Sequence, residues 1–394
     1  MPWHSIVIVA NDRRFSNPVL VRSLAWVGDF SYSLYLVHWP LFALVRATGL
    51  STDLAPGTSV LLIILSFVLA LLLYRFVEEP LRRVPVEGRT LLMAAVAGSM
   101  VVFALAFVLG KTKPNALATS NLLKPVEGLG GKNCFRESGE LFDGKCSQST
   151  SPAILLWGDS YSAHLVPGIV ATTSRPLAQA SIGHCTPFAN YAGVVTANEF
   201  EWTKGCLAFN ASVIEYARRT PSLEVVILAG QYDRTLAAGS EYAIRKSPDG
   251  SVVRAPLGLK QTVEAQRETV AKLRSFGLRV VVVSPPPPSP FDIGLCWQRR
   301  VEHVPTIGIY RDCIIHKNNP ARAEQQFDAM MAGFEQRAHV PVIRVEQAIC
   351  RLGKCQSEFH GKPLFRDTGH LTEWGSIVVG KRFDLGPLAW RAAL

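Results

Sequence analysis

Two segments far apart in the sequence contain residue types that together could form a nucleophile and its base. Ser160 follows an apolar run in ILLWGDSYSAH, and Asp367 stands three residues before His370 in LFRDTGHLTEWGS. A serine hydroxyl becomes a strong nucleophile when a base accepts its proton, and an imidazole base is oriented by a carboxylate. The spacing predicts a triad in which Asp367 orients His370 and His370 activates Ser160. Taken singly, each segment is also typical of a surface turn, because Gly, Asp and Ser favour turns.

Apolar segments that alternate with helical periodicity would position these residues. The predicted strands lie at residues 153–157, 177–182, 224–229, 278–284 and 340–345. The predicted helices between them lie at residues 162–172, 206–219, 259–276 and 321–337. Strands this apolar, separated by helices, indicate a parallel sheet covered on both faces, so we expect an α/β doubly wound domain. Ligands of such sheets bind beyond the carboxyl ends of the strands, and Ser160 directly follows the first strand.

Three apolar stretches earlier in the chain are candidates for membrane spans, which need ~20 apolar residues. They lie at residues 30–50, 59–77 and 90–110, and the one at 30–50 contains more polar atoms. Arginines cluster before the first stretch and between the last two, at Arg13, Arg14, Arg22, Arg75, Arg82, Arg83 and Arg89. By the positive-inside rule these clusters are cytoplasmic, so we expect the chain after Gly110 to lie outside the cytoplasm.

The cysteines agree with an exported region. All eight follow the apolar stretches, at Cys134, Cys146, Cys185, Cys206, Cys296, Cys313, Cys350 and Cys355. An even number confined to this region indicates disulfides formed in an oxidising compartment. Sequential pairing would give the shortest loops, but the sequence leaves the connectivity open. Zinc is the alternative for Cys350 and Cys355, yet no second close pair completes a tetrahedral site, so we expect no metal.

Charge and hydropathy limit the classes of partner and set the domain boundaries. The chain has 394 residues, a net charge of +10 and a mean hydropathy of +0.18. A positive charge attracts anionic glycans or lipid headgroups, or simply favours solubility, while no basic stripe with aromatic residues indicates nucleic-acid binding.

We expect a membrane region with about three transmembrane helices at 1–110, a linker at 111–152 and the α/β domain at 153–394. The first residues lack the features of a signal peptide and look like the tail of something longer.

The α/β region resembles a known superfamily. GDS after the first strand, together with a C-terminal DxxH, resembles the SGNH (GDSL-like) hydrolases over most of residues 153–383. The resemblance implies that Ser160 is the nucleophile, His370 the base and Asp367 the residue that orients it. It also implies an oxyanion hole, a set of hydrogen-bond donors that stabilises the negatively charged intermediate.

One block of that resemblance departs from the family pattern. The superfamily forms its oxyanion hole from the N–H of the nucleophile, a glycine of a second block and the asparagine of a GxND block. Here Ser160 and Gly183, in SIGHC, match the first two. The third block reads Gly-Gln-Tyr-Asp from Gly230, so Tyr232 stands where the asparagine would be and Gln231 becomes the candidate donor.

The membrane region has a resemblance of its own. FSYSLYLVHWPLF and YRFVEEPLRR are similar to the C-terminal end of the acyltransferase-3 (AT3) family of membrane sugar O-acyltransferases, over about residues 20–83. That family often carries an extra span and a fused SGNH domain outside the membrane. Its donor-handling His and Arg residues lie in earlier helices that this sequence does not contain. We interpret His38, which neighbours Trp39, as a membrane-interface residue.

Together the two resemblances imply an O-acyltransferase, most simply an O-acetyltransferase of lipopolysaccharide or exopolysaccharide. Acetyl-CoA would be the ultimate donor, a cell-surface glycan the acceptor, and no cofactor would be bound. A separate or missing membrane acyltransferase portion would supply acyl groups. We expect the chain in the bacterial inner membrane, with the SGNH domain periplasmic or extracellular. The alternatives are a membrane-anchored periplasmic carbohydrate esterase and a degenerate, non-catalytic glycan-binding module.

Overall fold

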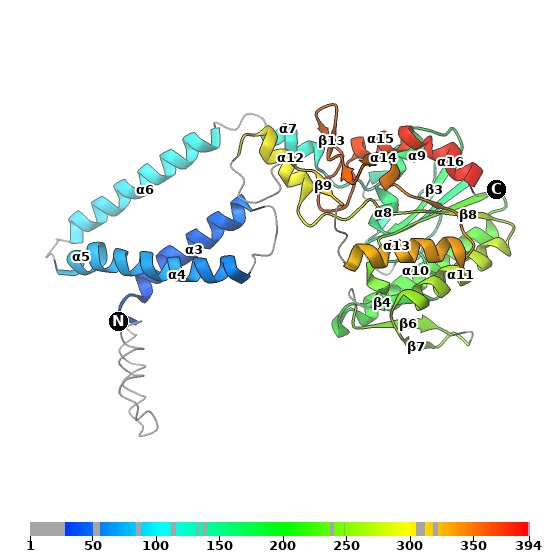
Figure 1. Ribbon diagram of the computed structural model, residues 1–394, viewed down its shortest axis with the longest axis horizontal. Helices are drawn as coiled ribbons and strands as arrows, with labels where there is room; N and C mark the ends of the chain where they lie inside the picture. Colours follow the sequence, from blue (N-terminus) through cyan, green and yellow to red (C-terminus); the bar gives the residue numbers. More distant parts are fainter. Residues whose placement is uncertain are drawn as a thin grey trace, which may run out of the picture. The chain divides into compact units, whose positions relative to one another are not determined.

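The computed structural model describes most of the chain in two compact units. The described residues are 28–49, 56–83, 88–111, 116–131, 134–136, 140–236, 240–247, 249–304, 312–317 and 322–392. Those up to 111 belong to one unit and those from 116 onward belong to the other (Figure 1).

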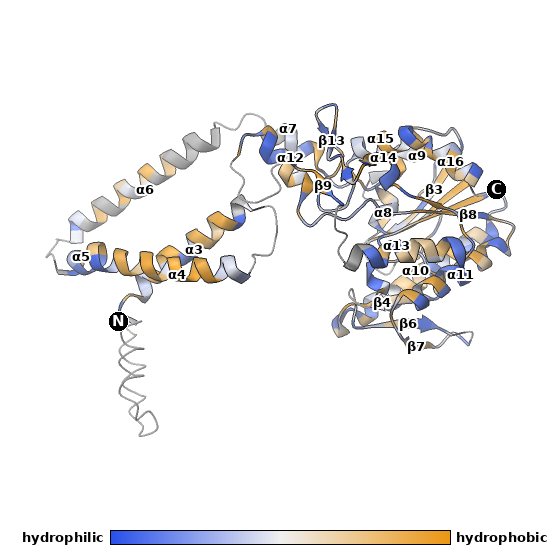
Figure 2. Cartoon of the chain, viewed as in Figure 1, coloured by the Kyte–Doolittle hydropathy of each residue, from blue (hydrophilic) through white to orange (hydrophobic). Residues whose placement is uncertain are grey.

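The first unit is helical. Its helices are α3 (Ser31–Thr48), α4 (Pro56–Leu73), which continues through a π-helical turn (Tyr74–Glu78) into α5 (Glu79–Arg83), and α6 (Gly88–Lys111). Each of the three stretches predicted to span a membrane is therefore helical. Among the described residues, one continuous helix, Pro56–Arg82, is long and apolar enough to cross a membrane. Figure 2 shows α4 as apolar on the side in view. The spans at 30–50 and 90–110 stay predictions.

The two sequence motifs of this unit contact each other. The hydroxyl of Ser33, in α3, donates a hydrogen bond to the carboxylate of Glu78 in the π-helical turn. Arg82, one turn further along, forms an ion pair with the same carboxylate. Ser33 is almost fully buried, so this contact fixes α3 against the end of α4.

The second unit is built on a parallel sheet, as the sequence predicts, but the sheet has six strands rather than the five expected. The strands are β1 (Phe135–Arg136), β2 (Ile154–Gly158), β3 (Leu177–Ile182), β5 (Val225–Ala229), β8 (Arg279–Val283) and β10 (Val342–Ile343). Their order is β1-β3-β2-β5-β8-β10, and every neighbouring pair is parallel. The order therefore reverses at β2, because β3 lies on one side of it and β5 on the other.

Helices cover both faces of this sheet (Figure 1). One layer contains α10 (Phe200–Arg219), α11 (Leu259–Arg274) and α13 (Arg322–Gln336). The other contains α9 (Val166–Val170), α15 (Glu373–Phe383) and α16 (Leu385–Ala392). The residues of β2, β3 and β5 are all buried, which is why β2 and β5 are apolar rather than alternating, whereas β3 contains two buried polar residues, Gln179 and Ser181.

The helix predicted at 162–172 is confirmed only in part, because the chain forms two short helices there instead of one. The first is α8 (Ser160–Ala163), and α9 begins after a break at His164 and Leu165. Pro167 lies in the first turn of α9, where its missing N–H needs no partner. Inside one continuous helix the same proline would remove a hydrogen bond and clash with the preceding turn.

Smaller elements surround the main sheet and were not predicted from the sequence. The helices are α7 (Ala116–Leu122), α12 (Ile293–Val301) and α14 (Glu346–Ile349). One antiparallel sheet contains β4 (Tyr191–Val194), β6 (Tyr242–Lys246) and β7 (Val252–Ala255). Another contains β9 (Ile315–His316), β11 (Cys350–Arg351) and β12 (Lys354–Cys355), and a hairpin pairs β13 (Glu358–Phe359) with β14 (Lys362–Pro363).

All eight cysteines form disulfides, and the pairing is sequential. The bridges are Cys134–Cys146, Cys185–Cys206, Cys296–Cys313 and Cys350–Cys355. The first bridge and strand β1 lie in the segment treated above as a linker. The folded unit therefore includes part of residues 111–152.

Candidate active site

The turn after β2 carries the Gly-Asp-Ser segment at the point where the strand order reverses. Gly158 approaches β5 so closely that a Cβ atom there would lie 1.6 Å from the carbonyl oxygen of Ala229. Only glycine fits at this position. Asp159 then caps α8, because its Oδ1 accepts the N–H of Tyr161 at 2.8 Å. The reversal point of a doubly wound sheet is where ligands bind, so Ser160 lies at the expected edge.

The structure brings Ser160, His370 and Asp367 together. Ser160 Oγ lies 2.8 Å from His370 Nε2, and His370 Nδ1 lies 2.9 Å from Asp367 Oδ2. Both distances are those of good hydrogen bonds. The side chains of His370 and Asp367 are 20% and 33% exposed, so a substrate can reach them. The chain of contacts from hydroxyl to imidazole to carboxylate is the one that nucleophilic catalysis requires.

Asp367 is held in its charged form. Burial alone would raise the pKa of this carboxyl group, but hydrogen bonds and charge from His370 outweigh it and hold the pKa well below its usual range. The backbone N–H groups of Gly369 and His370 also donate to Oδ1, at 2.9 and 2.8 Å. A carboxylate with these partners keeps the proton of the imidazole on Nδ1 and leaves Nε2 facing Ser160.

Two aromatic side chains from α8 and its end pack around His370, and the sequence did not assign them to the site. The ring of Tyr161 lies 4.5 Å from the ring of His370, measured between centroids. His164 lies 5.9 Å from the same ring and is 2% exposed. The one available signal was sequence proximity, because both residues lie within four positions of Ser160. The helical spacing favours packing in the core over lining a cleft for His164, and the structure shows that it is buried.

The residue that replaces the family asparagine points away from this edge. Tyr232 has a left-handed backbone with φ of 63°, a conformation that asparagine tolerates better than tyrosine. Its ring is fully buried against Phe188 and Phe334. Its hydroxyl has no hydrogen-bond partner within the described chain. Tyr232 is therefore a core residue and cannot donate to a substrate.

The other expected oxyanion donors lie at the carboxyl ends of adjacent strands. Gly183 directly follows β3, which pairs with β2, and Gln231 follows β5 by two residues. The backbone N–H of Gln231 is already used, because it donates to Asp159 Oδ2 at 2.9 Å. If Gln231 contributes a donor, it must be the side-chain amide.

Charged groups lie near Gly183 and Gln231. Burial lowers the pKa of His184, and nearby Arg234 lowers it further. Arg234 forms a 2.7 Å ion pair with Glu199. Burial raises the pKa of Asp233, against the effect of Arg234. The edge of the sheet next to the triad is therefore polar, which suits a hydroxyl-rich ligand.

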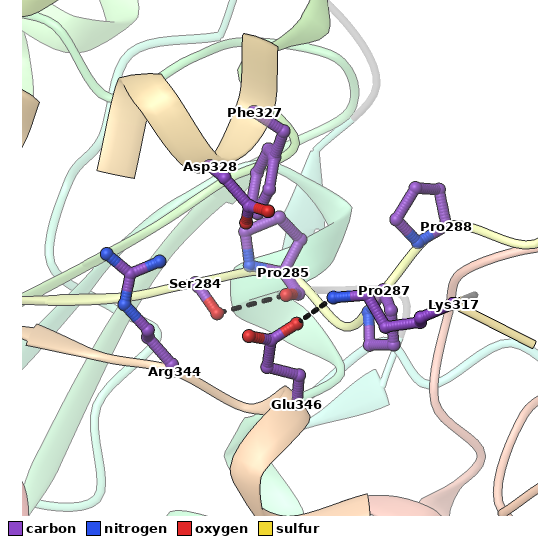
Figure 3. A pocket seen from close by; sticks show the side chains of 9 residues that line it. All are labelled: Ser284, Pro285, Pro287, Pro288, Lys317, Phe327, Asp328, Arg344 and Glu346. Carbon is purple, nitrogen blue, oxygen red and sulfur yellow. Dashed lines mark hydrogen bonds and ion pairs between the residues drawn. The ribbon is translucent and has the colours of Figure 1, made fainter. Parts of the chain in front are cut away.

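A pocket near the ends of β8 and β10 is lined by residues other than the candidate triad. Figure 3 shows its lining, which includes Ser284, Lys317, Asp328, Arg344 and Glu346 but no triad residue. Lys317 and Glu346 form a 2.5 Å ion pair across it. Its volume of about 10 Å³ is that of a single water molecule, too small for a sugar. Within the described residues, no group of three His, Cys, Asp or Glu side chains is arranged to hold a metal.

Comparisons with known proteins agree with this fold. A family model described as "SGNH domain (fused to AT3 domains)" matches residues 133–385. The fold is similar to the solved periplasmic domain of a lipopolysaccharide acetyltransferase from Salmonella ser. Paratyphi A, with a TM-score of 0.50 and 16% identity. That alignment covers 68% of this chain and 97% of the solved chain. No curated protein matches the sequence. At this identity the structural likeness shows the fold alone.

Proposed function

The chain belongs to the SGNH family whose domains are fused to AT3 domains, and on this premise we propose that it is an O-acyltransferase of an exported glycan. One observation carries the proposal. Ser160, His370 and Asp367 form a continuous hydrogen-bonded chain at the carboxyl edge of the sheet. Acetyl is the proposed acyl group, which is consistent with the acetyltransferase named for the similar solved domain.

The first half of the reaction forms an ester on Ser160. His370 Nε2 accepts the proton of the hydroxyl as Oγ attacks the acyl carbonyl carbon. The negative charge on the carbonyl oxygen would be stabilised by the N–H groups of Ser160 and Gly183 and by the side-chain amide of Gln231. The intermediate then collapses, the bond to the leaving group breaks, and His370 gives its proton to that group. Asp367 stabilises the imidazolium in between.

The second half transfers the acyl group to the acceptor. His370 accepts the proton of a sugar hydroxyl, whose oxygen attacks the ester carbon. The bond to Oγ breaks, and the proton returns from Nε2 to Ser160. Water can take the place of the sugar, because the imidazole is 20% exposed. A carbohydrate esterase with the same residues is therefore the second candidate function.

Location and donor supply belong to the same proposal. Four disulfides support an oxidising compartment outside the cytoplasm. The helix Pro56–Arg82 would anchor the chain in the inner membrane. Acetyl-CoA is the proposed ultimate donor, and its acyl group would have to cross the membrane through further helices or a partner protein. The proposed acceptor is a sugar hydroxyl of a surface glycan.

A reconstitution experiment tests the proposal and separates transferase from esterase. The purified full chain in vesicles would receive a small acetyl ester and an oligosaccharide acceptor, and acetylated sugar and free acetate would be quantified. We expect acetylated sugar well above a Ser160→Ala control. If only acetate forms, the chain is an esterase. If neither acetylated sugar nor acetate forms, the chain is the non-catalytic glycan-binding module. With acetyl-CoA on the side opposite the SGNH domain, we expect no transfer by this chain alone.

A further inference from the structure

His164 lies directly behind the proposed base. Its ring meets the ring of His370 nearly edge to face, with centroids 5.9 Å apart and an interplanar angle of 86°. The ring of Tyr161 contacts both imidazoles, at 5.1 Å from His164 and 4.5 Å from His370. Because His164 is 2% exposed, it cannot touch a substrate. Any role in the reaction must pass through His370.

A hydrogen bond defines which nitrogen of His164 carries the proton. The backbone N–H of Leu371 donates to His164 Nδ1 at 3.3 Å. An acceptor nitrogen has no proton, so the neutral ring carries its hydrogen on Nε2. Burial, reinforced by the nearby His370 and Arg366, holds the pKa of His164 well below its usual value. The ring is therefore neutral and acts as a hydrogen-bond acceptor.

This arrangement leaves a polar atom unsatisfied. His164 Nε2 is buried and has no hydrogen-bond partner within the described chain. A buried donor without a partner destabilises a fold, and an apolar ring at this position would avoid that cost. An imidazole that is unfavourable for stability but sits against the proposed base calls for a functional explanation.

The peptide bond that follows His370 supplies the explanation. Its carbonyl oxygen, on His370, accepts the N–H of Arg366 at 2.9 Å. Its N–H, on Leu371, donates to His164 Nδ1 at the other end. The peptide plane is thus held from both sides, which fixes the backbone that directs the imidazole toward Ser160. Leu371 is fully buried, so bulk water does not reach its N–H in place of His164.

We propose that His164 is a positioning residue for His370, acting through the N–H of Leu371. This inference rests on the proposed triad chemistry. It deepens that chemistry by adding a residue that lies outside the family motifs and does not contact the substrate. Without the acceptor, the His370–Leu371 peptide can rotate and Nε2 can leave the line to Ser160 Oγ. A misplacement of the base by about 1 Å lowers kcat by up to about 10²-fold and affects KM less.

Three substitutions of His164 separate positioning from simple packing. His164→Asn keeps the acceptor, because Asn Oδ1 and His Nδ1 are both bonded to Cγ. His164→Phe removes the acceptor but also removes the unsatisfied Nε2–H, so the two effects on stability oppose each other. His164→Leu repeats the test if the larger ring does not fit. Gln266→Met is the matched control, because Gln266 is fully buried in α11 and both its amide atoms lack partners within the described chain.

The measurements use the full chain in nanodiscs. Hydrogen exchange followed by mass spectrometry reports the Leu371 amide, and ester turnover gives kcat and KM. In His164→Phe we expect faster exchange at Leu371 and a kcat lower by about tenfold or more at unchanged KM. We expect His164→Asn to restore most of the slow exchange at Leu371 and most of the wild-type kcat. Gln266→Met should change neither the exchange nor kcat. The amide of Thr372, which donates to Leu364, is the internal reference.

Several results would contradict these proposals. Wild-type kcat in both His164→Phe and His164→Leu would overturn the inference, and so would a His164→Asn enzyme as slow as His164→Phe. If the wild-type chain turns over no ester, the proposed function fails. In that case hydrogen exchange by itself still tests the role of His164. Unchanged protection of the Leu371 amide in His164→Phe would refute the proposed positioning of the His370–Leu371 peptide.

Discussion

Asp159 Oδ2 accepts a 2.9 Å hydrogen bond from the backbone N–H of Gln231, joining the turn after β2 to the loop after β5. Its other oxygen caps α8 through Tyr161. The carboxylate therefore holds both segments that border Ser160. Asp159→Asn keeps the shape but turns one acceptor into a donor. We expect it to lower the free energy of unfolding by about 1–3 kcal/mol and to reduce kcat. Thermal unfolding and ester turnover would measure the two effects, and an unchanged unfolding midpoint would contradict this role.

The same carboxyl group predicts how stability depends on pH. Burial raises the pKa of Asp159 to about 7, although two backbone N–H groups favour the charged form. In the unfolded chain the pKa is near 3.8, so between these values the folded state binds more protons than the unfolded state. The contribution of protonated Asp159 to the free energy of unfolding is present in full below pH ~4 and is lost as the pH rises through ~7. The unfolding midpoint of the wild type should thus fall from pH 5 to pH 8 relative to Asp159→Asn. Parallel curves would show that Asp159 does not titrate in this range.

The triad predicts complete dependence on two side chains. Ser160→Ala removes the nucleophile and His370→Ala removes the base, so we expect each to lower kcat by about 10⁴-fold or more, while the disulfide-linked fold remains. Ester turnover measures the effect, and circular dichroism checks the fold. Ser174→Ala, at an exposed position beyond α9, is the control and should behave as wild type. Near-normal activity in either triad variant would exclude the proposed mechanism.

Substitutions at the neighbouring positions Gln231 and Tyr232 should differ in their effect on kcat. Gln231→Ala should lower kcat by about 10²-fold if its amide stabilises the oxyanion. Tyr232→Phe removes a buried hydroxyl that has no partner within the described chain, so stability should rise or stay the same and kcat should not change. Steady-state kinetics of the two variants decides the matter. A large loss of activity in Tyr232→Phe would mean that the tyrosine reaches the substrate after all.

The disulfides should differ in what they contribute. Cys185 and Cys206 are 21 residues apart, whereas Cys350 and Cys355 are 5 apart. Loop-closure entropy predicts that replacing the first pair by serine costs about 1 kcal/mol more than replacing the second. Denaturant unfolding of the two double variants measures the difference. Peptide mapping without reductant should find no free thiol in the wild type, and extensive alkylation of the native chain would contradict export.

Much of the architecture could be predicted from local patterns. Buried parallel strands need continuous apolar runs, and these runs located β2, β3, β5 and β8 to within a residue or two. Because the carboxyl ends of parallel strands meet at one edge, Ser160 after the first strand and the late Asp-x-x-His segment could be expected together. Both signals lie in short stretches of sequence, so they can be read without knowledge of distant contacts.

The tertiary structure decided what distant segments do to each other. Tyr232 fills a core formed with Phe188 and Phe334, and the third block alone could not show whether its side chain points to the substrate or inward. His164 meets the N–H of Leu371 from 207 positions away, and its sequence neighbours show only that it could lie on a helix. Hydrogen-bond partners and burial depend on these long-range contacts, whereas strand and helix patterns repeat along the chain. The sequence by itself therefore determined the sheet and the candidate triad of Ser160, His370 and Asp367, and the packing of the folded chain determined which side chains surround His370.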